Sequence, residues 1–212
     1  MIAAILLAPP WAIRPAVGVL AAFALLEFLL LLLRKLPRRG MAVSWLWFAV
    51  AFAAGAAVVA VGLGALAEIA IRHGNVMLLY VVAIVKFSDV GGFALGLTTA
   101  KLMKGGNHKM CPTISPAKSW EGLAGSLVFS CAVSCAFIPA THFAVGKALA
   151  FGIAAAVAGT AGDLVESKFK RWVGVKDSST MKITNGMGGF LDMIDSLLFA
   201  PAVLYFLMGL KF

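Results

Sequence analysis

The sequence predicts an all-α, polytopic integral membrane protein with about six transmembrane helices. Hydrophobic residues make up 62% of its 212 residues and charged residues only 13%, against about 25% charged residues in an average soluble domain. The apolar residues fall in six stretches of roughly 20 residues each, the length at which a helix crosses a bilayer. A soluble chain this short could not bury so much apolar surface, so lipid must serve as its solvent.

The apolar stretches are separated by short polar connections, and we treat residues 1–212 as a single transmembrane domain. Residues 1–14 are also apolar but are broken by Pro9-Pro10, so whether they span the membrane is left open. No basic segment precedes them, which argues against a signal peptide. The six predicted spans run approximately over residues 15–33, 44–66, 76–98, 120–140, 143–162 and 190–210.

Basic residues alternate between the two sides of the predicted bundle. The first, third and fifth connections hold 13 of the 18 Lys and Arg residues. Because Lys and Arg are retained on the cytoplasmic side, we expect these connections to face the cytoplasm and both termini to lie outside. We expect the protein to be a multi-pass protein of the cell's inner (cytoplasmic) membrane. This topology explains the net charge of +9 without a nucleic-acid partner. The 13 residues are Arg34, Lys35, Arg38, Arg39, Lys101, Lys104, Lys109, Lys118, Lys168, Lys170, Arg171, Lys176 and Lys182.

Eight of the nine acidic residues approach this same face, and only Glu68 lies on the other side. Glu27 and Asp89 lie inside predicted spans. An ionisable side chain there costs about 3 kcal/mol on insertion scales and indicates a function by default. The eight residues are Glu27, Asp89, Glu121, Asp163, Glu166, Asp177, Asp192 and Asp195.

The spacing of four of these acids is typical of paired carboxylates. Asp192 and Asp195 are three residues apart, and Asp163 and Glu166 repeat this spacing, so each pair shares one helix face. Such carboxylates repel one another, and a hard divalent cation such as Mg²⁺ removes the repulsion.

Basic residues flank these pairs, and with a cation they would suit a polyphosphate ligand. They are Lys170, Arg171 and Lys176. The spacing leaves a second interpretation open, in which Asp192 or Asp195 forms an internal ion pair with Lys170 or Arg171.

Glycines mark two further places. Gly186, Gly188 and Gly189 precede the last span, where backbone N–H groups can approach phosphate oxygens beside a helix N-terminus. A glycine-rich helix entry is also a common turn, so both readings stay open. Gly92 and Gly96 are four residues apart, which predicts close helix packing.

The segment SPAKSWEG, residues 115–122, predicts the start of the fourth span. Ser119 suits the N-cap, Glu121 the first helical turn, and Trp120 the membrane interface. Lys118 beside this helix start either binds a phosphate or has a structural role, and the residue types alone do not decide between them.

Three segments, in this order, resemble the phosphatidate cytidylyltransferase (CDP-diacylglycerol synthase) family. DVGGFALG, residues 89–96, is similar to the family's Asp-x-x-Ala-Tyr-x-x-Gly segment, and SPAKSWEG is similar to its Ser-Pro-x-Lys-Thr-Trp-Glu-Gly motif. GDLVESKFKRWVGVKDS and GGFLDMIDS, within residues 162–196, are similar to its C-terminal signature. The resemblance implies a catalytic core over residues 76–212, preceded by N-terminal helices in residues 1–75.

The chain departs from the family pattern at two positions near its C-terminal signature. Met187 stands where the family has His, and Met193 stands where it has Arg between the last two aspartates. These changes either weaken phosphate contacts or require another base to substitute. The N-terminal region is also shorter than is usual in the family, so the chain is either a compact member or a part of a longer protein.

The resemblance implies a nucleotidyltransferase that transfers CMP from CTP to phosphatidate, giving CDP-diacylglycerol and pyrophosphate for phospholipid biosynthesis. It implies Mg²⁺ as cofactor and is compatible with a second cation such as K⁺. The implied partners are CTP, phosphatidate and membrane lipids, and the resemblance is compatible with a homodimer.

The same resemblance implies roles for individual residues. The implied metal ligands are Asp177, Asp192 and Asp195, with Asp163 and Glu166 as further candidates. The implied catalytic residues are Lys170, Arg171, Lys176, Asp177, Asp192 and Asp195. The implied substrate-binding residues are Asp89, which would orient Lys86 or another base, and Ser115, Lys118, Ser119, Ser167, Gly188 and Gly189.

Two other functions are weighed against this one. A CTP-dependent polyprenol or phytol kinase would also need paired acids and bases at the cytoplasmic face, but it would release CDP and not pyrophosphate. A small membrane transporter would use Glu27, Lys86 and Asp89 as a pathway across the bilayer. The charges cluster at one face and no inverted repeat is evident, which disfavours a transporter.

Overall fold

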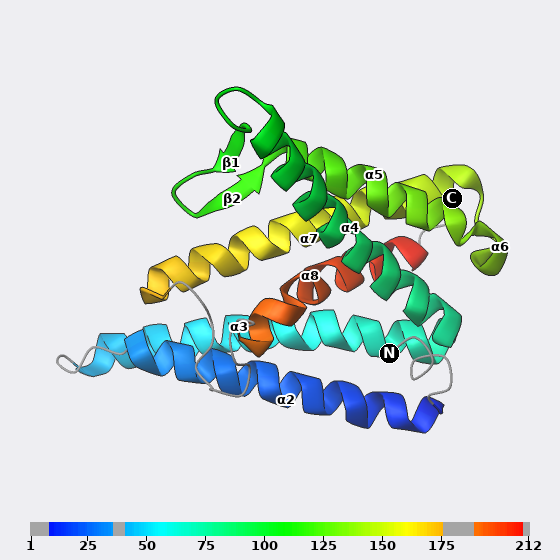
Figure 1. Cartoon of the computed structure of the whole chain (residues 1–212). Coiled ribbons are helices and arrows are strands. Elements are labelled where there is room, and N and C mark those ends of the chain that lie inside the picture. The colour runs from blue at the N-terminus through cyan, green and yellow to red at the C-terminus, as the bar shows by residue number, and fades with distance from the viewer. Residues whose placement is uncertain (1–8, 36–40, 176–188, 210–212) are drawn as a thin grey trace.

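The computed structural model describes residues 9–35, 41–175 and 189–209, which form seven helices and one β-hairpin (Figure 1). The helices are α2 (Pro10–Lys35), α3 (Met41–His73), α4 (Asn75–Leu102), α5 (Trp120–Ala136), α6 (Ile138–Thr141), α7 (Val145–Val173) and α8 (Phe190–Gly209). The hairpin pairs β1 (Lys109–Cys111) with β2 (Ser115–Ser119) in antiparallel register, Lys109 opposite Ser119.

The helices agree with the predicted spans. Five of the described helices are long and apolar enough to cross a membrane, and α5, with 17 residues, is a shorter apolar helix. The chain is therefore a multi-pass membrane protein, as the sequence predicted. The hairpin between α4 and α5 was not predicted.

Helix α7 continues well past the predicted end of the fifth span. The predicted span ended at residue 162, but the helix runs to Val173 and therefore carries Lys170 and Arg171, which were expected in a connection. Glu166 and Lys170 form an ion pair at 3.4 Å one turn apart, and such pairs stabilise a helix where its apolar face ends. Gly174 then ends the helix with a φ of 87°, a conformation that suits glycine.

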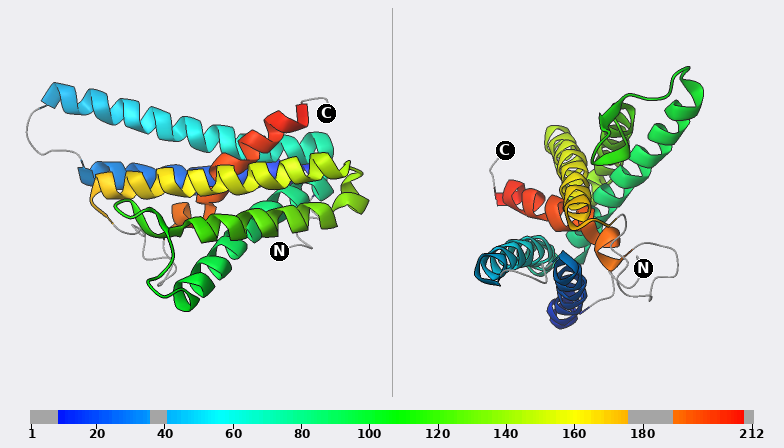
Figure 2. Two further views of the ribbon diagram at one scale, coloured as in Figure 1. Left: turned by 90° about the horizontal axis from the view of Figure 1, so that it is seen from above. Right: turned by 90° about the vertical axis from the view of Figure 1, so that its left-hand side faces the viewer.

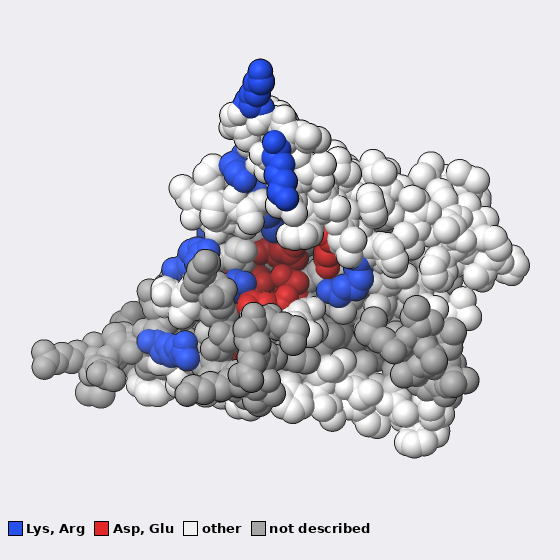
Figure 3. Space-filling view, viewed as in Figure 1, with Lys and Arg blue, Asp and Glu red and all other residues white. Residues whose placement is uncertain are grey.

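Helices α2, α3, α5 and α7 run roughly along the length of the bundle, whereas α4 and α8 cross it obliquely (Figures 1 and 2). Helix α2 begins and α8 ends at the same end of the bundle. The hairpin, the C-terminal ends of α4 and α7, and the first turn of α8 lie at the opposite end. Seen end-on, α2 and α3 form one side of the bundle and α4, α5 and the hairpin form the other, with α7 and α8 between them (Figure 2). Basic side chains gather at the hairpin end (Figure 3).

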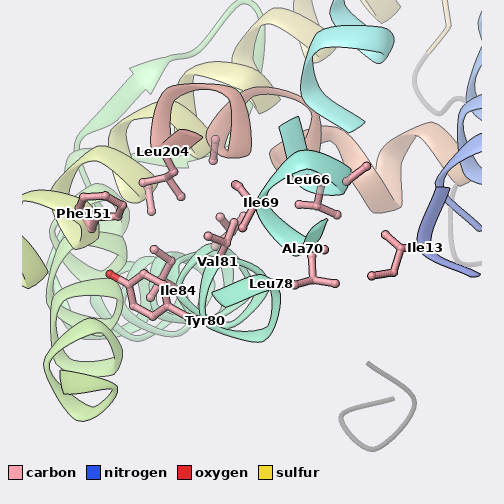
Figure 4. Packing of buried hydrophobic residues seen from close by; sticks show 14 residues of the cluster. Ile13, Leu66, Ile69, Ala70, Leu78, Tyr80, Val81, Ile84, Phe151 and Leu204 are labelled. Atoms are coloured by element: carbon pink, nitrogen blue, oxygen red, sulfur yellow. The ribbon is translucent and has the colours of Figure 1, made fainter. Parts of the chain in front are cut away.

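Two apolar clusters stabilise this arrangement. The first joins α3, α4, α7 and α8, and Figure 4 shows Tyr80, Ile84, Phe151 and Leu204 packed within it. The hydroxyl of buried Tyr80 lies 2.7 Å from Ser134 Oγ, so its polar end is satisfied. The second cluster, around Phe28, joins α2, α3 and α8 and extends to the start of α8.

Helices α4 and α5 touch through their backbones. A Cβ atom added at Gly91 would lie 2.5 Å from the carbonyl oxygen of Gly125, and one at Gly92 would lie 2.5 Å from Ser126 Oγ. Gly96 of α4 faces Gly122 of α5. The predicted packing role of Gly92 and Gly96 is therefore confirmed, and it brings the C-terminal half of α4 close to the helix that β2 leads into.

Candidate active site

Charged side chains gather in a hollow at the hairpin end of the bundle. The space-filling view shows acidic side chains inside the hollow and Lys and Arg side chains around it (Figure 3). The acids come from three helices: Asp89 from α4, Asp163 and Glu166 from α7, and Asp192 and Asp195 from α8. Helices α7 and α8 pack against each other, so the two predicted carboxylate pairs face a common space.

Lys118 connects the hairpin to α7. Its Nζ atom donates to Asp163 Oδ2 at 2.6 Å and to the Thr160 carbonyl oxygen at 3.2 Å. Both charged side chains are largely buried, with 20% and 25% of their surface exposed, which strengthens the ion pair relative to one on an open surface. The other carboxylate oxygen of Asp163 is buried and has no hydrogen-bond partner among the described residues.

Lys170 connects α7 to α8. Its Nζ atom donates to Asp192 Oδ1 at 2.6 Å and lies 3.4 Å from Glu166 Oε2. Asp192 also accepts the backbone N–H of Gly189 at 3.1 Å, which helps to cap the start of α8. The internal ion pair that the spacing left open is therefore present for Asp192 and Lys170.

Lys86 connects α4 to α8 on the other side of the hollow. Its ammonium donates to Asp89 Oδ2 at 3.3 Å, to the Met193 carbonyl oxygen at 3.1 Å and to Ser196 Oγ at 3.0 Å. The Ser196 hydroxyl in turn donates to Asp89 at 2.9 Å. Asp89 thus forms an ion pair with Lys86, the base that the resemblance implied it would orient.

Among the described residues, the hollow holds five carboxylates and three lysines, a formal excess of two negative charges. Asp163 interacts with Asp195, and Glu166 interacts with both Asp192 and Asp195. Both oxygens of Glu166 are buried and accept no hydrogen bond from the described residues. Carboxylates crowded together with few donors are costly when buried, and a divalent cation would compensate their charge.

The chemistry of these side chains fits Mg²⁺, which prefers oxygen ligands and carboxylates in particular. In the part of the chain that the structure describes, no group of three or more His, Cys, Asp or Glu side chains is already arranged to hold a metal ion. Lys118 pairs with Asp163 and Lys170 pairs with Asp192. The Glu166 oxygens and the second Asp163 oxygen accept no hydrogen bond from the described residues. Magnesium binding by these residues remains a prediction.

Two cavities border the carboxylates. One cavity, of about 230 Å³, lies between α4, α5, α7 and β2, and Asp89, Lys118 and Asp163 supply its charged lining. The other, of about 370 Å³, lies between α2, α3, α7 and α8, and Glu166 and Asp195 supply its charged lining. Its apolar lining includes Phe28, Val58, Phe169, Leu198 and Phe199. A cavity with charged side chains in its lining and a nearly apolar cavity therefore meet the same cluster.

Other predicted site residues lie at the edge of the site or in the elements that surround it. The Ser119 hydroxyl is buried and accepts the Gly122 N–H at 3.1 Å, which confirms the predicted N-cap. Arg171 donates to the carbonyl oxygens of Ile114 and Val175 at the outer side of α7. Ser115 starts β2, and Ser167 is half-buried on α7.

Three predicted site residues lie outside the described residues. They are Lys176, Asp177 and Gly188. Gly189, at the start of the described α8 segment, is buried and donates to Asp192.

Sequence reasoning missed two contributors to this site. Ser196 is fully buried and joins Lys86 to Asp89. Its position one turn after Asp192, in an otherwise apolar helix, was an available signal. The ring of His108 lies 2.6 Å from Glu121 and its backbone N–H donates to the same carboxylate at 3.1 Å, which fixes the hairpin to the start of α5.

Several known proteins are similar in sequence to this chain. A phosphatidate cytidylyltransferase of Mycobacterium bovis is 44% identical over 115 residues, which cover 52% of this chain and 34% of the relative. One of Haemophilus influenzae is 39% identical over 144 residues, or 63% of this chain and 46% of the relative. An uncharacterised Escherichia coli protein, YnbB, is 35% identical over 139 residues, or 65% of this chain and 44% of the relative.

The matched segments thus span about a third to a half of the length of these relatives. The model of the cytidylyltransferase family matches residues 1–211, nearly the whole chain. The resemblance that the three motifs suggested is therefore confirmed, and the chain belongs to the cytidylyltransferase family.

Proposed function

We propose that this protein transfers CMP from CTP to phosphatidate, giving CDP-diacylglycerol and pyrophosphate. The observation that carries the proposal is the position of the carboxylate and lysine cluster between a cavity partly lined by charged side chains and a nearly apolar one. A nucleotide triphosphate and a lipid phosphate need such a junction. Family membership and the names of the Mycobacterium and Haemophilus relatives support the same reaction.

In the proposed reaction, a phosphate oxygen of phosphatidate attacks the α-phosphorus of CTP. The new P–O bond forms as the bond to the β-phosphate breaks, and pyrophosphate leaves with that electron pair. The attacking oxygen is already anionic, so the site does not need a strong general base. Its task is to bring two anions together and to compensate their charge.

Lysines supply part of this charge in our proposal. Lys118 and Lys170 are each held by a carboxylate at 2.6 Å, which keeps their ammonium groups at fixed places in the hollow. Lys86 is fixed in the same way on the opposite side. Arg171 and Lys176 would contact pyrophosphate or the lipid headgroup at the outer edge.

The acids would hold the cation. Glu166 and Asp195, with Asp163, Asp192 and Asp177, would bind Mg²⁺, and a K⁺ ion is a candidate second cation. When bound, Mg²⁺ would compensate phosphate charge and favour departure of pyrophosphate. The formal excess of two negative charges among the described residues of the hollow supports a divalent ion.

The apolar cavity would take an acyl chain of phosphatidate. It is bounded by α2, α3, α7 and α8, and its charged lining, Glu166 and Asp195, belongs to the carboxylate cluster. A lipid lying along this cavity would have its phosphate at the cluster and its chain against Val58, Phe169 and Leu198. We also propose that the site faces the cytoplasm at the inner membrane, a location that the distribution of Lys and Arg supports. A homodimer is part of the same proposal.

The reaction is tested with detergent-solubilised protein, phosphatidate, Mg²⁺ and CTP labelled in its cytidine. We expect label to move into the lipid and pyrophosphate to appear in equal amount. E68Q serves as a control for loss of a carboxylate, because Glu68 pairs with Arg14 and Arg72 outside the site. Folded protein that leaves the lipid unlabelled would overturn the proposal, and transfer from γ-labelled CTP to a lipid alcohol would identify the kinase alternative.

A further inference from the structure

Glu27 is a buried carboxylate in the C-terminal half of an apolar helix. It lies in α2, and only 1% of its surface is exposed. A charged side chain in a membrane-spanning segment is costly unless other groups of the protein compensate it. The site described above does not include Glu27, so its burial calls for another explanation.

The start of α8 supplies a partner for this carboxylate. Glu27 Oε2 accepts the backbone N–H of Leu191 at 2.6 Å, although the two residues are 164 positions apart. Leu191 is the second residue of α8. The first N–H groups of a helix lack partners within the helix, and the positive end of the helix dipole favours an acid there.

The same helix start carries the acids of the site. Asp192 follows Leu191 directly and accepts both the Gly189 N–H and the Lys170 ammonium. Asp195 lies one turn further along the same face. Phe28, next to Glu27, and Leu191 belong to one apolar cluster. A shift of Leu191 would therefore move Asp192 and Asp195 relative to α7.

We propose that Glu27 is a positioning residue for the proposed nucleotidyl transfer. It fixes the first turn of α8 against α2, so that Asp192 and Asp195 face Glu166 and Lys170. Glu27 acts through the backbone of Leu191 and does not contact substrate. This inference rests on the proposed function for its kinetic part, whereas the anchoring of α8 is testable without any activity.

Three substitutions separate position from charge. E27Q keeps a side-chain oxygen at the same reach but removes the charge. E27D keeps the charge but shortens the side chain by one methylene, and E27L removes the acceptor altogether. E68Q is the matched control, because Glu68 is the acid that pairs with Arg14 and Arg72 at the other end of the bundle.

The first measurement is amide hydrogen exchange in detergent, followed in peptides that contain residues 189–196. If Glu27 anchors α8, E27L and E27D speed this exchange at least tenfold, whereas E27Q and E68Q stay within about threefold of the wild type. Unchanged exchange in E27L and E27D would overturn the anchoring. If E27L does not fold, E27D and E27Q decide the question by themselves.

The second measurement is the rate of cytidine transfer with its dependence on CTP and Mg²⁺. We expect E27L and E27D to lose at least tenfold in kcat and to need more Mg²⁺ for half-maximal rate, with KM for CTP within about threefold. E27Q should keep at least a third of the wild-type kcat. Full kcat in E27D with faster exchange, or greater activity in E27D than in E27Q, would overturn the positioning role. A wild type without transfer would instead refute the proposed function, and the exchange result would still decide the anchoring.

Discussion

The Lys170 ammonium lies 2.6 Å from the Asp192 carboxylate and joins the end of α7 to the first turn of α8. The two residues are 22 positions apart, and the ion pair keeps the carboxylates of both helices in one hollow. A side chain held in this way is pre-organised for charge compensation, because little reorganisation remains when substrate binds.

The substitution D192N tests this arrangement. The amide loses the charge that attracts Lys170 and a metal ion, so we expect cytidine transfer to fall at least about 100-fold, roughly 2.7 kcal/mol in transition-state stabilisation. The measurement is labelled-CTP transfer on protein that elutes as a single detergent-solubilised species. E68Q, treated identically, should keep full activity. Full activity of folded D192N with Mg²⁺ would mean that Asp192 neither binds a metal nor positions Lys170.

The ion pair between Lys118 and Asp163 is tested by a double-mutant cycle. Each single substitution, K118M or D163N, leaves a largely buried partner without its counter-charge, so we expect each to lower kcat/KM at least about tenfold. The double variant should lose less than the product of the two single losses, because neither charge remains unpaired. Strictly multiplicative losses would show that the two side chains act independently.

The apolar cavity is tested by filling it from α3. Val58 lines the cavity, whereas Val61 on the same helix is 60% exposed on its outer surface. We expect V58W to raise KM for long-chain phosphatidate at least about fivefold, since an indole displaces acyl-chain contacts worth about 0.8 kcal/mol per methylene, with KM for CTP unchanged. V61W is the matched control and should alter neither value. Equal lipid kinetics in V58W and the wild type would exclude this cavity as the acyl-chain site.

The backbone contact between α4 and α5 is tested through stability. In G91A, the new methyl group would lie 2.5 Å from the Gly125 carbonyl oxygen and 2.6 Å from Phe129 Cβ. Such overpacking costs about 1–3 kcal/mol, so we expect the midpoint of thermal unfolding in detergent, followed by tryptophan fluorescence, to fall by several degrees. In G146A the methyl group meets nothing within 4 Å on the exposed start of α7, and the midpoint should hold or rise. A G91A midpoint equal to that of the wild type would show that the two helices can separate without cost.

Hydropathy predicted where the chain crosses the membrane but not where each helix ends. The fifth span was predicted to end at residue 162 because the charges begin there, yet α7 continues to Val173. Hydropathy reports transfer into lipid, whereas a helix depends on backbone hydrogen bonds and on pairs such as Glu166 with Lys170. The hairpin was missed because its strands are short and are held in place by contacts with other elements. One such contact joins Asn107, just before β1, to α4: its side-chain amide donates to the Gly96 carbonyl oxygen at 2.8 Å.

The residues of the candidate site were predicted more fully than their pairings. Residue spacing placed Asp163 with Glu166 and Asp192 with Asp195, and the structure brings both pairs to one hollow. Spacing could not select Lys118 as the partner of Asp163, because the two are 45 positions apart and meet only through helix packing. The same limit hid the contact of Glu27 with the start of α8.

The length of α7 has a consequence for where a lipid would meet this site. At about 1.5 Å per residue its 29 residues extend about 44 Å, which exceeds the roughly 30 Å thickness of the hydrocarbon core. With Val145 at one boundary of that core, the opposite boundary falls near Asp163 and Glu166. The carboxylates would then lie at the depth where bilayer phosphates already reside. A lipid substrate would need only to diffuse within the plane of the membrane to deliver its phosphate, without being lifted out of its leaflet.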